Sequence, residues 1–235
     1  MNIEPEKIVF NSSVDGKGDY FMLHRAGKDC LVWLHGHGSH GEQPFTRQDV
    51  VGFLHPLLEK YDLSVISPNL RDNAWMSTAA VADLAGILTG AKKEYGFERY
   101  IFLCGSMGGT GALIFAAYHP ELVDRLGIMG AATDIGRYRE FCRTGTHPVH
   151  EQLYQAITEN YSESDYIRHN VCNMAEKLTM PICFYHGESD PVMPVSEMTE
   201  LQKLMPQGAK AVFKSVPGEH DAPLAYMDEI LSFLI

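Results

Sequence analysis

The sequence lacks the features that mark membrane, repeat and disulfide-stapled proteins. It has no internal repeat, no low-complexity linker and no apolar run near the roughly 20 residues that span a bilayer. Its five cysteines are an odd number and include no C-x-x-C pair, which argues against a disulfide framework or a redox pair. We therefore expect a single globular domain over residues 1–235, although the length alone also allows two small domains.

Positive charge is scarce as well. The chain has 19 Lys and Arg against 30 Asp and Glu, a net charge of −11, which disfavours nucleic acid or an anionic membrane surface as a partner. The first residues, Met-Asn-Ile-Glu-Pro-Glu-Lys, carry acids and a proline where a signal peptide has an apolar stretch. Cys30, Cys104 and Cys183 fall in or beside apolar runs, where a free thiol packs as a small hydrophobe. We expect a cytoplasmic protein, and the sequence leaves a homo-oligomer open.

Short apolar runs alternate with helical patterns along most of the chain. Strands are expected at residues 20–23, 30–35, 64–67, 100–104, 126–129, 182–185 and 211–216. Apolar residues at 3.6-residue spacing, such as Val81, Leu84 and Leu88, predict helices between them. The alternation predicts an α/β fold in which a mostly parallel central sheet has helices on both faces. Ligands of such sheets bind beyond the carboxyl ends of the strands.

One stretch, from about residue 134 to 180, breaks the alternation. It contains no convincing strand and is rich in Tyr, His and Arg. A connection of this length is usually a functional insertion. We expect a small helical cap over the functional site.

Ser106 lies in Leu-Cys-Gly-Ser-Met-Gly-Gly, directly after the expected strand at 100–104 and before a helix of small residues. A serine between a strand and a helix, flanked by glycines, is the signature of a nucleophile elbow. Such a serine needs a base, normally histidine, and a carboxylate that orients the histidine. Asp190 and His220 each follow one of the last two expected strands. They are the candidates for the acid and the base.

These motifs resemble those of the α/β-hydrolase superfamily over about residues 31–235. The G-x-x-D-x-V-x-P pattern around Asp190 and the G-x-x-H pattern around His220 resemble the loops of esterases and dienelactone-hydrolase-like members. The first small residue of the elbow, usually glycine, is Cys104 here, and cysteine is small enough for the turn. The resemblance implies the α/β-hydrolase fold and a Ser106-His220-Asp190 catalytic triad.

An oxyanion hole is expected from two backbone N–H groups. Met107, the residue after the nucleophile, supplies one of them. The loop His35-Gly36-His37-Gly38 resembles the H-G-x-G oxyanion loop of the family, so the N–H of His37 is the candidate for the second.

Several residues have competing interpretations. Asp134 also follows an expected strand, so it is either an alternative acid or a helix N-cap. His35, His37 and His40 invite a metal site, but a glycine-rich loop has no fixed face to gather them. Arg71 and Trp75 follow the strand at 64–67 and are candidates for the substrate pocket, or part of an ordinary loop. No cofactor or metal is expected.

The expected activity is hydrolysis of a small-molecule carboxylic ester with a small or medium acyl group, through an acyl-enzyme. The triad fixes mechanism better than substrate. A peptidase of the prolyl-oligopeptidase kind, a thioesterase and a C–C bond hydrolase therefore remain alternatives, as does a ligand-binding protein without catalysis.

Overall fold

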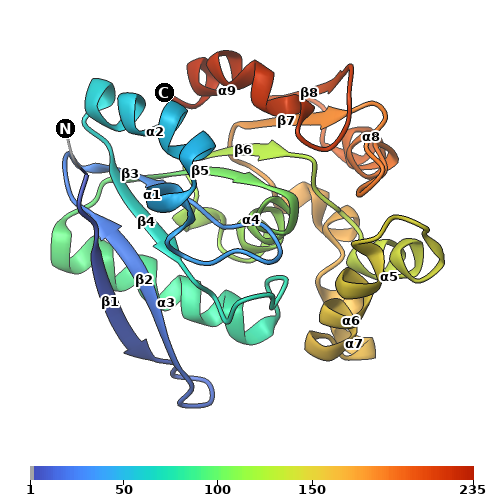
Figure 1. Ribbon diagram of the computed structural model, residues 1–235, viewed down its shortest axis with the longest axis horizontal. Coiled ribbons are helices and arrows are strands. Elements are labelled where there is room, and N and C mark those ends of the chain that lie inside the picture. The colour runs from blue at the N-terminus through green and yellow to red at the C-terminus, as the bar shows by residue number, and fades with distance from the viewer. Residues whose placement is uncertain (1–2) are drawn as a thin grey trace.

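A computed structural model describes residues 3–235 of the protein, and its centre is a single twisted sheet (Figure 1). Within that range eight strands pair in the order β1-β2-β4-β3-β5-β6-β7-β8. Their bounds are Glu6–Asn11 (β1), Gly18–His24 (β2), Asp29–Val32 (β3), Ser64–Pro68 (β4), Arg99–Gly105 (β5), Arg125–Met129 (β6), Ile182–Gly187 (β7) and Ala211–Val216 (β8). β1 and β2 are antiparallel to their neighbours, and the remaining pairs are parallel. The expected mostly parallel sheet is confirmed.

Helices cover both faces of this sheet. The α-helices are Gln43–Thr46 (α1), Gln48–Tyr61 (α2), Thr78–Tyr95 (α3), Ser106–Tyr118 (α4), Ile135–Thr144 (α5), His150–Asn160 (α6), Glu163–Arg168 (α7), Ser196–Leu204 (α8) and Met227–Leu234 (α9). Short 3-10 helices span Pro120–Leu122 (η1), Val171–Lys177 (η2) and Ala222–Tyr226 (η3). α2 and α9 pack on one face, whereas α3, α4 and α8 pack on the other (Figure 1).

The burial of each strand explains why it forms. All five residues of β4 and all six of β7 are buried, as expected for strands covered on both faces. Alternate residues of β5 face opposite sides of the sheet. Ile101 and Leu103 pack in the core beneath α2 and α9, and Tyr100 and Phe102 pack in the core on the opposite face. β1 is an exposed edge strand, with Val9 73% exposed.

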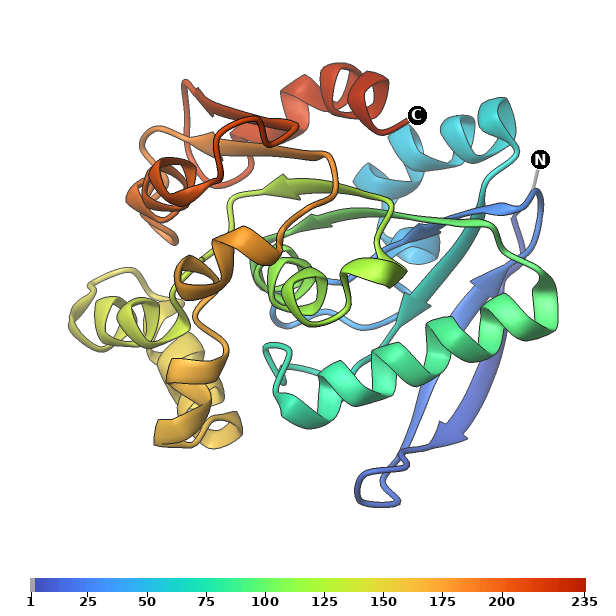
Figure 2. The ribbon, with the colours of Figure 1, turned by 180° about the vertical axis from the view of Figure 1, so that it is seen from behind.

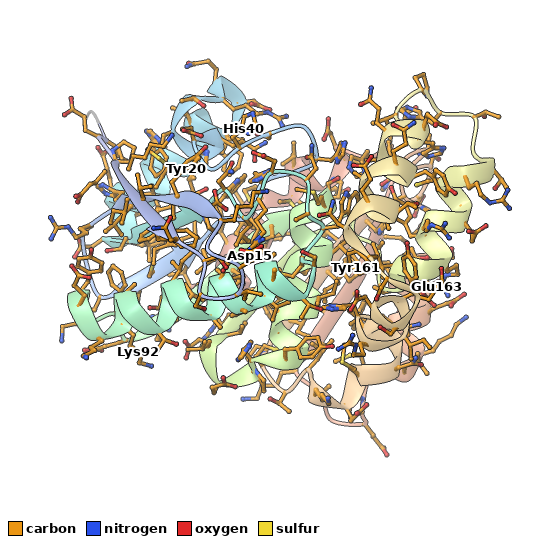
Figure 3. The ribbon with its side chains drawn as sticks, turned by 90° about the horizontal axis from the view of Figure 1, so that it is seen from below. Asp15, Tyr20, His40, Lys92, Tyr161 and Glu163 are labelled. Atoms are coloured by element: carbon orange, nitrogen blue, oxygen red, sulfur yellow. The ribbon has the colours of Figure 1, made fainter. Side chains whose placement is uncertain are left out.

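Residues 134–180, called the insertion below, form α5, α6, α7 and η2. All of these residues are described, and none is in a strand. The helices α5 to α7 stand together at the side of the molecule away from β1 and β2 (Figure 2). Their shared core includes Tyr138, Leu153 and Ile157 and is continuous with Trp75 and Met107 of the main body. In Figure 3, Tyr161 lies at the boundary between the insertion and the main body.

Two further findings concern the cysteines and the apolar character of the helices. The five cysteines are free thiols, and four of them are buried. Of the helices in residues 3–235, none combines the length and the apolar character needed to cross a membrane.

Candidate active site

Ser106 begins α4 in a strained backbone conformation. Its φ is 56°, in the left-handed region that residues other than glycine and asparagine rarely adopt. Such strain is concentrated at functional sites. Close packing of α4 requires the glycine that follows, because a Cβ on Gly108 would lie 2.0 Å from the carbonyl oxygen of Leu34. The strand-turn-helix geometry therefore presents Ser106 at the carboxyl end of β5.

The structure brings Asp190 and His220 into direct contact. The Nδ1–H of His220 donates to Asp190 Oδ2 over 2.7 Å. Asp190 follows β7 and His220 follows β8, and these adjacent parallel strands end at the same edge of the sheet. Gly130, at the end of β6 with φ 50°, lies against the pair: a Cβ there would be 3.3 Å from His220 Nδ1 and 3.4 Å from Asp190 Oδ2.

The Asp190 carboxylate is buried and well supplied with donors. Its Oδ1 accepts the backbone N–H groups of Val192 at 2.8 Å and Met193 at 2.9 Å. Burial acts to raise the pKa of Asp190, but interactions with His186 and His220 and the Met193 N–H outweigh it and hold the pKa below its ordinary value. The group is therefore an ionised carboxylate at neutral pH.

Ser106 and His220 line the same cavity, which has a volume of about 100 Å³. Its walls come from the end of β3, the α1–α2 segment, the elbow, the end of β6 and the His220 loop. The lining residues are Trp33, Leu34, Gly36, Gln43, Arg47, Asp49, Val50, Gly105, Ser106, Met129, His220, Asp221, Pro223 and Leu224. No residue of the insertion is among them. Half of the lining comes from residues 43–50 and 221–224.

The two candidate oxyanion donors come from the elbow and from the loop after β3. Met107 is the second residue of α4, and the first turn of a helix has N–H groups without intrahelical partners. The loop of His37 passes close to the serine, because a Cβ on Gly36 would lie 3.9 Å from Ser106 Cβ. The His37 ring is half-buried, and burial, together with the nearby His35, lowers its pKa. These positions agree with the expected donor loops, and their use as donors stays a prediction.

Arg71 is occupied by other partners. Its guanidinium donates to Asp83 at 2.7 Å, to Asp15 at 2.7 Å and 2.9 Å, and to Ser12 at 2.7 Å. It is absent from the lining of the Ser106 cavity. Arg71 thus links the β1–β2 turn to α3. Of the two interpretations offered by the sequence, an ordinary loop residue fits Arg71 better than a substrate-binding residue.

Trp75 lies behind the elbow and does not line the Ser106 cavity. It is 1% exposed and borders a small hollow together with Met107 and Gly108. Its ring packs against Tyr138 of the insertion, with centroids 5.6 Å apart, and its Nε1 is buried with no hydrogen-bond partner. Trp75 therefore lies in the protein interior, next to the candidate oxyanion donor Met107.

Asp134, the alternative acid, caps α5. Its Oδ1 accepts the N–H of Arg137 at 3.0 Å, and its Oδ2 accepts from Asn170 at 2.7 Å. Asp190, and not Asp134, contacts His220. Among the residues that the structure describes, no cluster of three His, Cys, Asp or Glu side chains is arranged to hold a metal ion.

Sequence reasoning connected none of three further residues with Asp190 or its loop. His186, at the end of β7, lies beside Asp190, while Tyr138 and His150 of the insertion reach the loop that carries it. The hydroxyl of Tyr138 and the Nε2 of His150 lie 3.2 Å and 3.3 Å from the carbonyl oxygen of Val192. The His-Gly dipeptide at 186–187 was the one available signal for His186.

Comparison with known proteins places this geometry in a fold class. No protein-family model matches the chain. The chain resembles an S-formylglutathione hydrolase of Staphylococcus aureus with a TM-score of 0.75 and 13% identity, covering 100% of both chains. It resembles an esterase of Pyrococcus furiosus with a TM-score of 0.72 and 14% identity, covering 99% of this chain and 92% of the other. The protein has the α/β-hydrolase fold, as the sequence motifs predicted.

One curated protein is similar in sequence over part of its length. It is the 2-hydroxy-6-oxononadienedioate/2-hydroxy-6-oxononatrienedioate hydrolase of Paraburkholderia phymatum, which is 34% identical over 113 residues. The match spans 46% of this chain and 38% of that hydrolase.

Proposed function

We propose that the protein is a serine hydrolase that cleaves carboxylic esters through an acyl-enzyme. The observation that carries the proposal is the joint position of three groups. Ser106, strained at an elbow, shares a cavity with His220, and His220 is hydrogen-bonded to the ionised Asp190. The esterase and the hydrolases to which the chain is similar support the same reaction class.

The chemistry follows from the protonation states. A carboxylate only accepts hydrogen bonds, so His220 carries its hydrogen on Nδ1 and keeps the Nε2 lone pair for the serine proton. Ser106 Oγ attacks the ester carbonyl as His220 takes this proton, and the imidazolium is stabilised by Asp190. His220 then gives the proton to the departing alcohol oxygen. Water, activated by the same histidine, releases the acid from Ser106.

The oxyanion formed in each step is assigned to the backbone N–H groups of Met107 and His37. Loss of one such donor costs a hydrolase about 10²- to 10³-fold in kcat. The cavity beside Ser106 is small, with a volume of about 100 Å³. This size favours a short acyl group.

Replacement of the nucleophile tests the proposal. Ser106→Ala is expected to reduce p-nitrophenyl acetate turnover by at least about 10³-fold and to abolish labelling by a fluorophosphonate probe. Ser196→Ala, at the first residue of α8, is the matched control and should keep both signals. Full turnover by folded Ser106→Ala would falsify the proposal, and a chain that binds ligands without catalysis would leave the probe unreacted.

A thioester is the second candidate substrate, because the chain resembles the S-formylglutathione hydrolase over its whole length. Turnover of an oxygen ester and a thioester with the same acyl group separates the two. We also propose a cytoplasmic location, since five free thiols are typical of a reducing compartment.

A further inference from the structure

A second histidine approaches the candidate catalytic acid. His186 is the fifth residue of β7, and its side chain is fully buried. Its Nε2 lies 2.9 Å from the carbonyl oxygen of Met193 and 3.4 Å from Asp190 Oδ2. Because a carbonyl oxygen only accepts, Nε2 carries the hydrogen, and this N–H faces the carbonyl and the carboxylate together.

The three residues form a closed ring of polar contacts. The N–H of Met193 donates to Asp190 Oδ1, the Met193 carbonyl accepts from His186, and His186 faces Asp190 Oδ2. Rotation of the Asp190 carboxylate would break contacts at both of its oxygens. The ring therefore fixes the plane of the carboxylate, and Oδ2 points to His220 at 2.7 Å.

Apart from these contacts, the His186 side chain has no polar partner among the described residues. Its Nδ1 is buried and has no hydrogen-bond partner, and its ring lies 5.9 Å from that of Phe184. His186 thus contacts polar groups through Nε2 alone. Three other titratable groups contact Asp190 or the Val192 carbonyl: His220, from the loop after β8, and Tyr138 and His150, from α5 and α6.

We propose that His186 is a positioning residue for catalysis: its Nε2–H fixes Asp190 in the orientation that aligns His220 with Ser106. This inference depends on the proposed function, since the alignment matters only if the triad works. Without the N–H, Asp190 and the 190–193 loop lose one support, and His220 spends less time aligned. The loss falls on kcat rather than on KM, because His186 does not line the substrate cavity.

Two substitutions separate the hydrogen bond from the bulk of the ring. His186→Leu removes the donor and keeps an apolar side chain of similar size. His186→Gln keeps an N–H near the position of Nε2. We expect kcat to fall about 10- to 100-fold in His186→Leu, as for residues that orient a ligand or base, and His186→Gln to recover most of that loss. The proton resonance of the His220 Nδ1–H should shift or broaden in His186→Leu and stay near its wild-type position in His186→Gln.

His169→Leu is the matched control. His169 is also buried, and its Nε2 lies 3.1 Å from Thr78 Oγ1, away from the acid loop. Its replacement should lower stability but leave kcat and the His220 resonance unchanged. If His186→Leu fails to fold, His186→Asn takes its place, because the Asn amide reaches the position of Nδ1 and not that of Nε2.

The outcomes are distinct. A folded His186→Leu with wild-type kcat and resonance, or a His186→Gln as impaired as His186→Leu or His186→Asn, overturns the inference. Either result leaves the proposed function intact as long as Ser106→Ala is inactive. Activity in Ser106→Ala, in contrast, overturns the function itself.

Discussion

The two sides of Ser106 are built differently. On the acid side, Asp190 receives hydrogen bonds at both oxygens, and backbone and side-chain donors converge on its loop. On the oxyanion side, two buried polar atoms, Trp75 Nε1 and His37 Nδ1, have no partner. The Asp190 carboxylate is therefore fully supplied with hydrogen bonds in the free protein, whereas these two atoms beside the candidate oxyanion loop are not.

Backbone strain follows the same division. Leu70, Arg71, Asp72, Trp75 and Met76 all have φ between 46° and 61°, and they belong to the segment that borders the oxyanion loop. Acid-loop residues show no such conformation within residues 3–235.

Specific contacts keep this strained segment in place. Asn73 Oδ1 accepts the N–H of Gly38 at 2.8 Å, and the hydroxyl of Tyr161 donates to the Trp75 carbonyl at 2.5 Å. The contrast suits the two tasks. In the proposed function, Asp190 keeps the same partners throughout, whereas the candidate oxyanion loop must leave N–H groups free for an oxygen that arrives with the substrate.

The largest expected effect is on the acid side. Asp190→Asn should lower kcat by about 10⁴-fold, because the amide favours the wrong tautomer of His220. Asp134→Asn is the control, since asparagine still caps a helix, and it should keep nearly full activity. Steady-state turnover of p-nitrophenyl acetate measures both. Equal losses in the two variants would contradict the assignment of the acid.

The second largest effect is expected where α4 packs against the chain that follows β3 and leads into the candidate oxyanion loop. In Gly108→Ala, the new methyl group would meet the Leu34 carbonyl at 2.0 Å and the His35 carbonyl at 2.9 Å, so α4 must move away from β3. We expect a loss of about 3 kcal/mol in the free energy of unfolding, with activity lost as well. Gly52→Ala on α2 has open space around it and should stabilise by about 0.5–1 kcal/mol. Urea denaturation of both variants checks the pair.

Acid should weaken the hydrogen bonds of the Asp190 carboxylate. The pKa of Asp190 is lowered in the folded protein, so its contribution to stability is complete above its unfolded pKa of about 3.9 and is lost as the pH falls toward the folded value. The difference in free energy of unfolding between wild type and Asp190→Asn should therefore be constant near neutral pH and shrink below about pH 4. A difference that grows on acidification would show that the carboxylate is not stabilised as described.

The smallest effect is expected at Trp75, whose Nε1 has no hydrogen-bond partner. Trp75→Phe removes an N–H that has no acceptor, which offsets the cost of the smaller ring, so stability should change by less than about 1 kcal/mol. Trp33 is the matched case, since its Nε1 donates to Gln43 Oε1 at 2.9 Å. Trp33→Phe leaves that acceptor unpaired and should cost about 1–2 kcal/mol more. Equal free energies of unfolding in the two variants would contradict the difference drawn between the unpaired Trp75 Nε1 and the paired Trp33 Nε1.

The sequence predicted the parts of the molecule that depend on local patterns. Seven of the strands were expected because their residues are apolar and continuous, but β1 was not, because its exposed residues dilute the apolar signal. Ser106 was predicted from its glycines, and Asp190 and His220 from their places after strands; the structure brings Asp190 and His220 into contact. The partners of Arg71 and the burial of Trp75 were unpredictable, since they depend on residues up to 63 positions away.

The position of the insertion was also beyond sequence reasoning. Its length and composition predicted a helical segment, but the side on which it packs depends on contacts such as that between Tyr161 and Trp75. His186 was missed for a similar reason. Its importance comes from two distances, to Met193 and to Asp190, that no local pattern encodes.

The contacts of Tyr138 and His150 with Val192 have a consequence for protein engineering. Shortening residues 135–160 to widen substrate access would leave the Ser106 cavity almost as it is, because other segments form its walls. The same deletion would remove two anchors from the loop that carries Asp190. If the proposed ester hydrolysis holds, efforts to broaden the range of substrates should therefore target residues 43–50 and 221–224, and leave α5 and α6 untouched.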